Sequence, residues 1–226
     1  MDSYTRYAIF VVPDGALFDV ASRWLGWDCV AGTALDPPVV EDLPVPAERL
    51  TKVPRRYGFH GTIKAPFALA PGTDAAQLAT ALSTFCAGRA PVVLPGLKVR
   101  RLGRFVALTP AAPTRALHDL AADTVRAFDR FRAPPSAAEL ARRRARGLTA
   151  LQDAMLEQWG YPHVMEAFRF HMTLTGPTDR ADDVHDALAR HFAPDLPARF
   201  TVDHLALMGE RADGTFHLIR RFELAG

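Results

Sequence analysis

Two short segments of the chain each place a threonine two residues after a histidine. One contains His60 and Thr62, and the other contains His171 and Thr173. Side chains of a β-strand alternate between its two faces, so residues two positions apart point in the same direction. Each segment therefore puts an imidazole and a hydroxyl on one face of a strand, while its neighbours pack on the other face. We refer to the two segments as the His-x-Thr motifs.

These residue types suit chemistry at a phosphorus atom. Imidazole has an unperturbed pKa of about 6.5, so one histidine can be neutral while another is protonated near neutral pH. Opening a phosphodiester or a cyclic phosphate needs a base that activates water or a hydroxyl and an acid that protonates the leaving oxygen. A threonine hydroxyl can donate a hydrogen bond to a non-bridging oxygen, worth roughly 3 kcal/mol by comparison with oxyanion-hole donors. We therefore predict acid–base catalysis on a phosphate ester.

Further candidate residues surround the motifs. On the predicted strand faces, Lys64 shares the side of His60, whereas Arg169 and Thr175 share the side of His171. Arginine and lysine bind phosphate, and a tyrosine can stack on or hydrogen-bond to a sugar or base. The predicted substrate- and phosphate-binding residues are Lys64, Arg56, Tyr57, Arg169, Thr175, Tyr161, Arg132 and Arg143.

A cluster of arginines covers residues 142–146 and is preceded by Arg130 and Arg132. Runs of this kind usually form a solvated helix face, and a second phosphate-binding patch is the alternative.

Other catalytic chemistries lack their usual residues. A zinc site needs three or four His, Cys or carboxylate ligands, whereas neither motif segment contains an Asp or Glu, and HExxH and CxxC are absent. The chain also has no GxSxG segment for a nucleophilic serine and no Walker-type phosphate loop. The sequence thus predicts an enzyme that uses no metal ion and no cofactor.

The elements around the two motifs occur twice in the same order. Each motif strand is followed by a Thr-Asp helix start, a helix and a hairpin. The first copy is predicted as a strand over 57–67, a helix over 75–87 and strands over 92–101 and 104–109. The second is predicted as a strand over 168–175, a helix over 178–192 and strands over 199–208 and 216–224. Two such copies can pack around a pseudo-twofold axis that brings the motifs face to face, linked by helices within residues 114–159.

The composition is that of an ordinary globular protein. The 226 residues are 49% hydrophobic and 23% charged, with a formal net charge of +2, which is too balanced to indicate general nucleic-acid binding. Two cysteines without a CxxC indicate a reducing compartment. The N-terminal residues do not resemble a signal peptide, and no apolar stretch approaches the roughly 20 residues of a membrane helix. We expect a cytoplasmic protein that does not contact a membrane; the sequence leaves its oligomeric state open.

Longer segments around the motifs resemble a known family. RRYGFHGTIKAPF, FDRFRAPPSAAELARRRARGL, WGYPHV and FRFHMTLTGP are similar to segments of the 2H phosphoesterase superfamily, in particular its subgroup associated with phosphonate utilisation. The superfamily includes RNA 2′,3′-cyclic phosphodiesterases and 2′-5′ RNA ligase-like proteins. The resemblance spans nearly the whole chain.

This resemblance implies a bilobal α+β fold with a pseudo-twofold axis, in which two antiparallel sheets line a central cleft and helices lie outside. The expected lobes are residues 1–112 and 163–226, joined by a helical linker over 113–162. The resemblance also implies that His60 and His171 form an acid–base pair, that Thr62 and Thr173 bind phosphate, and that no metal is needed. Gly61, inside the first motif, is expected to matter little.

Three functions remain open from the sequence. The favoured one is hydrolysis of a small phosphorylated sugar that carries a cyclic phosphate, such as a ribose 1,2-cyclic phosphate in phosphonate catabolism. The second is RNA-end processing by the same mechanism, and the third is binding of a phosphorylated ligand without catalysis. The near-neutral charge and the 9% aromatic content favour a small molecule over long RNA.

Overall fold

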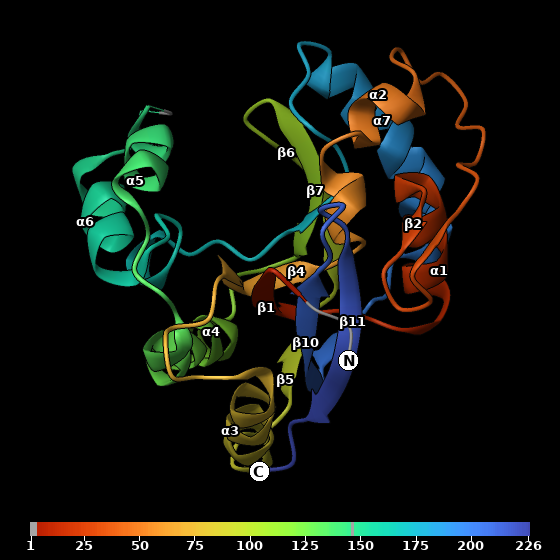
Figure 1. Ribbon diagram of the computed structural model, residues 1–226. Helices are drawn as coiled ribbons and strands as arrows, with labels where there is room; N and C mark the ends of the chain where they lie inside the picture. Colours follow the sequence, from red (N-terminus) through yellow and green to blue (C-terminus); the bar gives the residue numbers. More distant parts are fainter. Residues whose placement is uncertain (1–3, 146) are drawn as a thin grey trace.

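A computed structural model describes residues 4–145 and 147–226 of the chain (Figure 1). The α-helices are α1 (Gly15–Leu25), α2 (Ala47–Thr51), α3 (Ala75–Ala87), α4 (Arg115–Phe128), α5 (Ala137–Arg144), α6 (Ala150–Trp159) and α7 (Ala181–Phe192). Short 3-10 helices are η1 (Pro54–Tyr57), η2 (Asp129–Phe131), η3 (Met165–Ala167) and η4 (Ala193–Asp195). The strands are β1 (Arg6–Val11), β2 (Trp27–Asp28), β3 (Thr33–Ala34), β4 (Gly61–Phe67), β5 (Val92–Leu94), β6 (Leu97–Leu102), β7 (Phe105–Pro110), β8 (Met172–Thr173), β9 (Phe200–Val202), β10 (His204–Glu210) and β11 (Phe216–Glu223).

One antiparallel sheet runs through the centre of the molecule, in the strand order β11-β10-β1-β4-β8-β7-β6. Its two halves meet where β4 pairs with β8, and the register there joins Gly61 to Met172. The two sheets predicted from the sequence are therefore the two halves of a continuous sheet. The predicted fold class, an α+β fold of antiparallel strands with helices outside, is confirmed.

The structure repeats one set of elements. β4, α3, β5, β6 and β7 are followed later in the chain by β8, α7, β9, β10 and β11 in the same order. Equivalent strands pair with each other, because β4 is antiparallel to β8 and β5 is antiparallel to β9. Such pairing of equivalent strands is what a twofold axis between the halves requires.

The two halves exchange their hairpins. The β6–β7 hairpin, from the first half of the chain, pairs with β8, whereas the β10–β11 hairpin pairs with β1 on the side of β4. Helix α3 accordingly contacts β10 and β11, and α7 contacts β6 and β7. The lobes are therefore not the contiguous stretches 1–112 and 163–226 that the sequence suggested, since each contains a hairpin from the other part of the chain.

Both motif strands are shorter than predicted. The first begins at Gly61, because residues 54–57 form η1 and Gly58 follows with a φ of +71° that a continuing strand does not use. The second is reduced to Met172–Thr173. The first strand of each predicted hairpin is divided in two. The strand predicted over 92–101 is β5 and β6, and the strand predicted over 199–208 is β9 and β10. The predicted helix starts agree better with the structure than the predicted strands do, since Asp74 and Thr149 each form a capping box.

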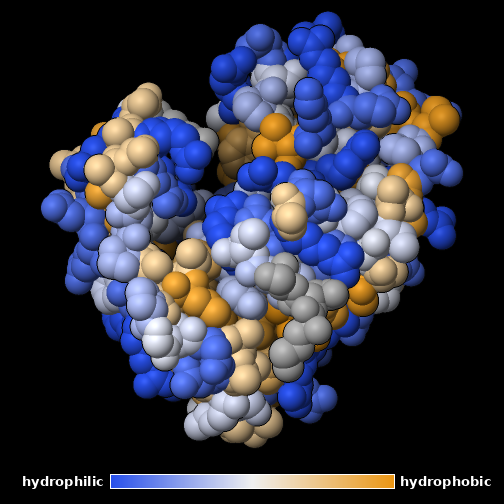
Figure 2. Space-filling model, in the orientation of Figure 1, coloured by the Kyte–Doolittle hydropathy of each residue, from blue (hydrophilic) through white to orange (hydrophobic). Residues whose placement is uncertain are grey.

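Helices α5 and α6 form an arm that stands apart from the sheet (Figure 1). No residue of α5 is buried, so this helix contributes nothing to the main core. The arm is attached through a separate small cluster in which Ala122 and Val125 of α4 pack against Val164 and Met165. The surface is hollowed between the arm and the rest of the molecule (Figure 2).

Candidate active site

A cleft of about 850 Å³ lies between the arm and the sheet, and both His-x-Thr motifs line it. Of the other predicted site residues, Arg56, Tyr57, Arg132, Arg143, Tyr161 and Thr175 also line the cleft. The lining further includes residues that the sequence did not single out, which are Arg6, Phe10, Phe105 and Glu139, together with Arg142 from the arginine cluster. Lys64 and Arg169 do not belong to the lining.

The pairing of β4 with β8 determines how the motifs face each other. Gly61 lies opposite Met172 in an antiparallel pair, so the register sets His60 opposite Thr173 and Thr62 opposite His171. Residues directly opposite each other share a face of the sheet. All four side chains are half-buried, whereas Gly61 and Met172 between them are buried. The two motifs thus form one compact group with a histidine from each strand and a hydroxyl from each strand.

His60 is fixed on several sides. Its Nδ1 lies 3.0 Å from the carbonyl oxygen of Gly58, and its Nε2 lies 3.1 Å from Oγ1 of Thr62. The ring stacks on Phe10 with a centroid distance of 3.8 Å. Because a carbonyl oxygen can only accept, Nδ1 carries the hydrogen in the neutral ring and Nε2 has the lone pair. Burial lowers the pKa of His60 to about 4, so this ring is neutral at pH 7.

His171 is fixed in the same way. Its Nδ1 lies 2.8 Å from the carbonyl oxygen of Arg169, again two residues earlier, and its ring lies near Phe105 with a centroid distance of 5.7 Å. Burial lowers the pKa of His171 below its ordinary value of 6.5. Both histidines therefore use Nδ1 for a backbone anchor and leave Nε2 for the cleft, which is the arrangement that acid–base catalysis needs.

The alternation of β4 breaks directly after the first motif. β1 pairs Phe10 with Thr62 but Ile9 with Lys64, so Ile63 is an extra residue and the strand bulges there. A bulge re-aims the side chains that follow it. The prediction that Lys64 lies on the same face as His60 is therefore wrong.

Lys64 lies beneath the cleft, against the end of α4. It is 3% exposed, and its Nζ is 3.4 Å from the carbonyl oxygen of Val125 and 3.6 Å from Oδ1 of Asp129. Burial lowers the pKa of its ammonium group to about 8, although Asp129 opposes this shift. These contacts indicate that Lys64 supports the base of the arm.

Two residues near the second motif use their polar groups within the protein. The guanidinium of Arg169 donates to the carbonyl oxygens of Glu166 and Phe168, outside the cleft. Thr175 is 1% exposed, and its hydroxyl accepts a hydrogen bond from the Val106 N–H at 3.0 Å. Regular strand geometry is limited to Met172–Thr173, so the alternation expected over 168–175 does not hold for these two residues. The prediction that Arg169 faces the site together with His171 is therefore wrong. The hydrogen bond of Thr175 to Val106 anchors the end of the second motif.

The tyrosines of the cleft already have partners on their rings. Tyr57 stacks on Phe216 at a centroid distance of 5.0 Å, and the guanidinium of Arg56 lies 4.6 Å from its ring centroid. The Arg143 guanidinium lies 5.2 Å from the ring centroid of Tyr161. A base could stack on Tyr57 only by displacing one of these groups.

The arginines of the cleft fall into two groups. Three are paired with carboxylates: Arg6 with Glu210, Arg132 with Asp129, and Arg143 with Glu139. Within residues 4–145 and 147–226, Arg142 makes no hydrogen bond or ion pair, and Arg56 makes a hydrogen bond and a cation–π contact to Tyr57 but no ion pair. The unpaired charge of the arm is thus at Arg142, which the predicted list of binding residues did not include.

Gly61 is required where the two halves of the sheet meet. A Cβ atom at this position would lie 2.3 Å from Cζ of Phe170. A contact that short cannot be accommodated without moving the ring or the strand. The expectation that Gly61 matters little is therefore wrong.

The described residues contain neither a candidate metal site nor a candidate membrane-spanning helix. Among residues 4–145 and 147–226, no group of three His, Cys, Asp or Glu side chains is placed to hold a metal ion. None of the helices in this part of the chain has the length and apolar character needed to cross a bilayer.

The chain was compared with known proteins. Residues 62–217 match the family described as "Protein of unknown function (DUF1045)". The chain is 37% identical over 222 residues to a "Ribose 1,5-bisphosphate phosphokinase PhnN" of Janthinobacterium sp. (strain Marseille), covering 94% of this chain and 49% of that protein. It is 34% identical over 231 residues to the protein of the same name from Laribacter hongkongensis (strain HLHK9), covering 95% of this chain and 51% of that protein. The chain thus spans about half the length of these curated relatives.

Solved structures with a similar chain path include that of E. coli LigT complexed with 3′-AMP. The alignment has a TM-score of 0.45 and 14% sequence identity, and it covers 99% of this chain and 100% of the LigT chain.

Proposed function

The chain belongs to the DUF1045 family, and we propose that it is a phosphoesterase of phosphonate metabolism that hydrolyses a cyclic phosphodiester on a small sugar without a metal ion. One observation carries the proposal. The antiparallel pair at Gly61 and Met172 sets two histidines and two threonines on one face of the sheet, and both histidines are anchored through Nδ1. One Nε2 atom from each motif is then available to a phosphate lying between the strands.

The reaction needs one proton to be taken and one to be given. A water molecule forms a bond to phosphorus while one ring P–O bond breaks, and the product is a phosphate monoester with a free hydroxyl. The base accepts the proton of the attacking water, and the acid protonates the leaving oxygen. The hydroxyls of Thr62 and Thr173 donate to the non-bridging oxygens as negative charge grows. Thr62 now lies against Nε2 of His60, and its hydroxyl turns to the phosphate when substrate binds.

We assign the base to His60 and the acid to His171. His60 is the more strongly shifted of the two, with a pKa of about 4, so it stays neutral over a wide pH range. The negative charge of a bound phosphate raises the pKa of both rings. His171, whose pKa starts below 6.5, is then the group that more readily carries a proton.

A small sugar fits the cleft better than a nucleic acid. The ring of Tyr57 stacks on Phe216 and is covered by Arg56, so this ring is not free to act as a stacking platform for a base. The cleft volume of about 850 Å³ is that of a small-molecule site.

The names of the curated relatives support the sugar phosphate and the link to phosphonate metabolism. The kinase activity in those names is not assigned to this chain, which spans about half of each relative and has no Walker-type phosphate loop.

A substrate panel tests the proposal. Purified protein in EDTA is offered a ribose 1,2-cyclic phosphate, a mononucleotide 2′,3′-cyclic phosphate and an RNA oligomer with a cyclic end, and the release of phosphate monoester is measured for each. The highest kcat/KM is expected for the ribose cyclic phosphate. A preference for the oligomer would identify an RNA-end enzyme instead, and binding of all three without turnover would identify a non-catalytic protein.

A further inference from the structure

The position of helix α5 beside the cleft is not explained by packing against the core. None of its residues is fully buried. Ser136 caps it by accepting from the Glu139 N–H, and Arg144 makes only an exposed ion pair with Asp153 of α6, a kind of contact that contributes little to stability. A helix without a fully buried residue gains little stability from packing. The face that it turns to the cleft therefore calls for another explanation.

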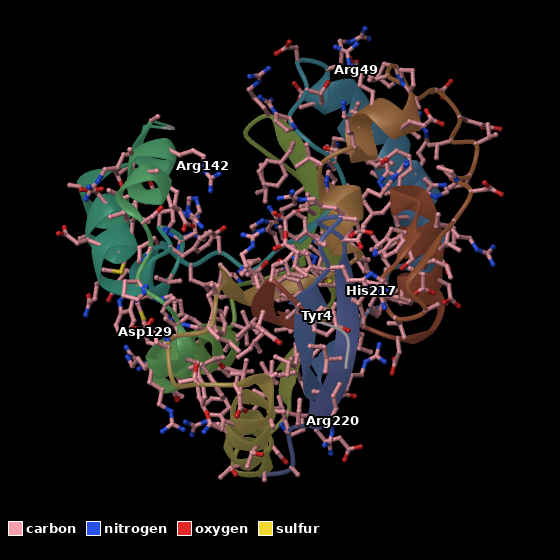
Figure 3. The ribbon with its side chains drawn as sticks, viewed as in Figure 1. Tyr4, Arg49, Asp129, Arg142, His217 and Arg220 are labelled. Carbon is pink, nitrogen blue, oxygen red and sulfur yellow. The ribbon has the colours of Figure 1, made fainter. Side chains whose placement is uncertain are left out.

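That face carries charge. Glu139, Arg142 and Arg143 are spaced three and four residues apart, which puts them on one side of the helix, and all three line the cleft. Glu139 accepts from Arg143 at 2.8 Å, so these two charges offset each other. The face thus presents one uncompensated cation, and Arg142 points from α5 toward the space between the arm and the rest of the molecule (Figure 3).

The base of the arm is stiffened by a second set of charges. Arg132 donates to both carboxylate oxygens of Asp129, at 2.8 and 3.1 Å, and to the carbonyl oxygen of Gln158 in α6. Lys64 of β4 reaches the same Asp129 at 3.6 Å. The motif strand and the arm are therefore connected through Asp129 and Arg132.

We propose that Arg142 forms a second anion subsite, on the arm side of the cleft, that binds a phosphate monoester at the far end of the substrate. This inference rests on the proposed function and names its substrate class, a sugar with a cyclic phosphodiester at one end and a phosphate monoester at the other. Arg143 and Glu139 hold the neighbouring surface in place, and the guanidinium of Arg142 supplies the bidentate donors that a phosphate accepts.

The chain offers a matched control on the same helix. Arg144 is also exposed and cationic, but it is paired with Asp153 and does not line the cleft. Arg144→Ala removes the same charge from α5 without touching the subsite, so it separates a specific contact from a general electrostatic effect.

The test compares a ribose 1,2-cyclic phosphate that carries a 5-phosphate with the same compound lacking it. We expect the wild type to prefer the doubly phosphorylated compound in kcat/KM by roughly tenfold to a hundredfold, the range of a hydrogen bond to a charged group. Arg142→Ala should abolish this preference, chiefly by raising KM, and Arg142→Lys should restore part of it. Arg144→Ala should leave the preference as in the wild type. Equal losses on both compounds in Arg142→Ala, or no preference in the wild type, would overturn the subsite.

A binding measurement keeps the subsite testable if neither compound is turned over. In that case the proposed hydrolysis fails, and calorimetric titration of ribose 5-phosphate into the wild type and Arg142→Ala decides the subsite alone. Affinity that falls in Arg142→Ala and not in Arg144→Ala supports it. Equal affinity in all three proteins contradicts it.

Discussion

Gly61 pairs with Met172 where β4 meets β8, and this buried pair joins the two halves of the sheet between the two His-x-Thr motifs that line the cleft. Each of these residues is the middle position of a His-x-Thr motif. The antiparallel register then places His60 across from Thr173 and His171 across from Thr62. The position of the proposed catalytic group thus follows from a single backbone pairing between segments more than a hundred residues apart.

Replacing Gly61 by alanine should destabilise the protein. The added Cβ would meet the Phe170 ring at 2.3 Å, and overpacking of this kind typically costs about 1–3 kcal/mol. Urea unfolding of Gly61→Ala measures the loss. Gly88→Ala is the control, because a Cβ there has no neighbour within 4 Å. Adding Phe170→Leu to Gly61→Ala should recover part of the stability, and equal stability of the two alanine variants would contradict the contact.

The threonine hydroxyls should act on the chemical step. Thr62→Val and Thr173→Val keep the shape of the side chain but remove the donor, so kcat should fall by about a hundredfold each with little change in KM. Serine at either position should restore most of the rate. Thr124→Val removes a buried hydroxyl that bonds to the Leu120 carbonyl oxygen, away from the cleft lining, and serves as the control. A loss confined to KM would show that the hydroxyls bind substrate and transition state alike.

The pH profile should be bell-shaped and centred in the acidic range. A base must be unprotonated, so kcat/KM falls as the pH drops through its pKa, and an acid must be protonated, so kcat/KM falls as the pH rises through its pKa. Burial lowers the pKa of His60 to about 4 and that of His171 below 6.5, so the optimum of kcat/KM lies below pH 6.5. The profile of kcat should lie at higher pH, because bound phosphate raises both values. A kcat/KM optimum at alkaline pH would contradict these environments.

Lys64 should prove dispensable for the reaction. Asp129 keeps its two bonds to Arg132 when Lys64 is replaced, so Lys64→Met leaves no unpaired buried charge. We expect kcat/KM within about threefold of the wild type and an undiminished free energy of unfolding at pH 7. A large loss of kcat would contradict this prediction and would indicate that Lys64 takes part in catalysis.

The same residue gives a prediction for stability against pH. The pKa of Lys64 is about 8 in the folded protein and 10.5 without the fold, so the unfolded chain binds more protons between these values. This group therefore makes the wild type more stable as the pH rises from 8 to 10.5. Comparing denaturant unfolding of the wild type and Lys64→Met across that window checks the sign, and identical slopes would contradict it.

Local pattern was enough to find the centre of the site. His60 with Thr62, and His171 with Thr173, share a face because strand alternation depends only on neighbouring residues. The order of elements also revealed the duplication, and helix starts such as Asp74 followed from capping chemistry.

Non-local contacts account for what the sequence did not reveal. The exchange of hairpins between the halves depends on pairing across the whole chain, and the bulge at Ile63 depends on the register with β1. The crowding of Gly61 by Phe170 arises only when the motifs meet. Arg142 and Arg143 lie three and four residues after Glu139, and both spacings allow an ion pair on a helix, so the sequence alone did not show which of them is paired.

The most direct measurement is the turnover of a ribose 1,2-cyclic phosphate, in EDTA, by the wild type, His60→Ala and His171→Ala. His185→Ala, on α7 and outside the cleft lining, is the control. The wild type and the control should keep their full rate in EDTA, and each cleft variant should lose a factor of roughly 100 to 10,000 while its melting temperature shows that it remains folded. Full activity in either cleft variant, or a wild-type rate that EDTA abolishes and added metal restores, would contradict catalysis by the two histidines.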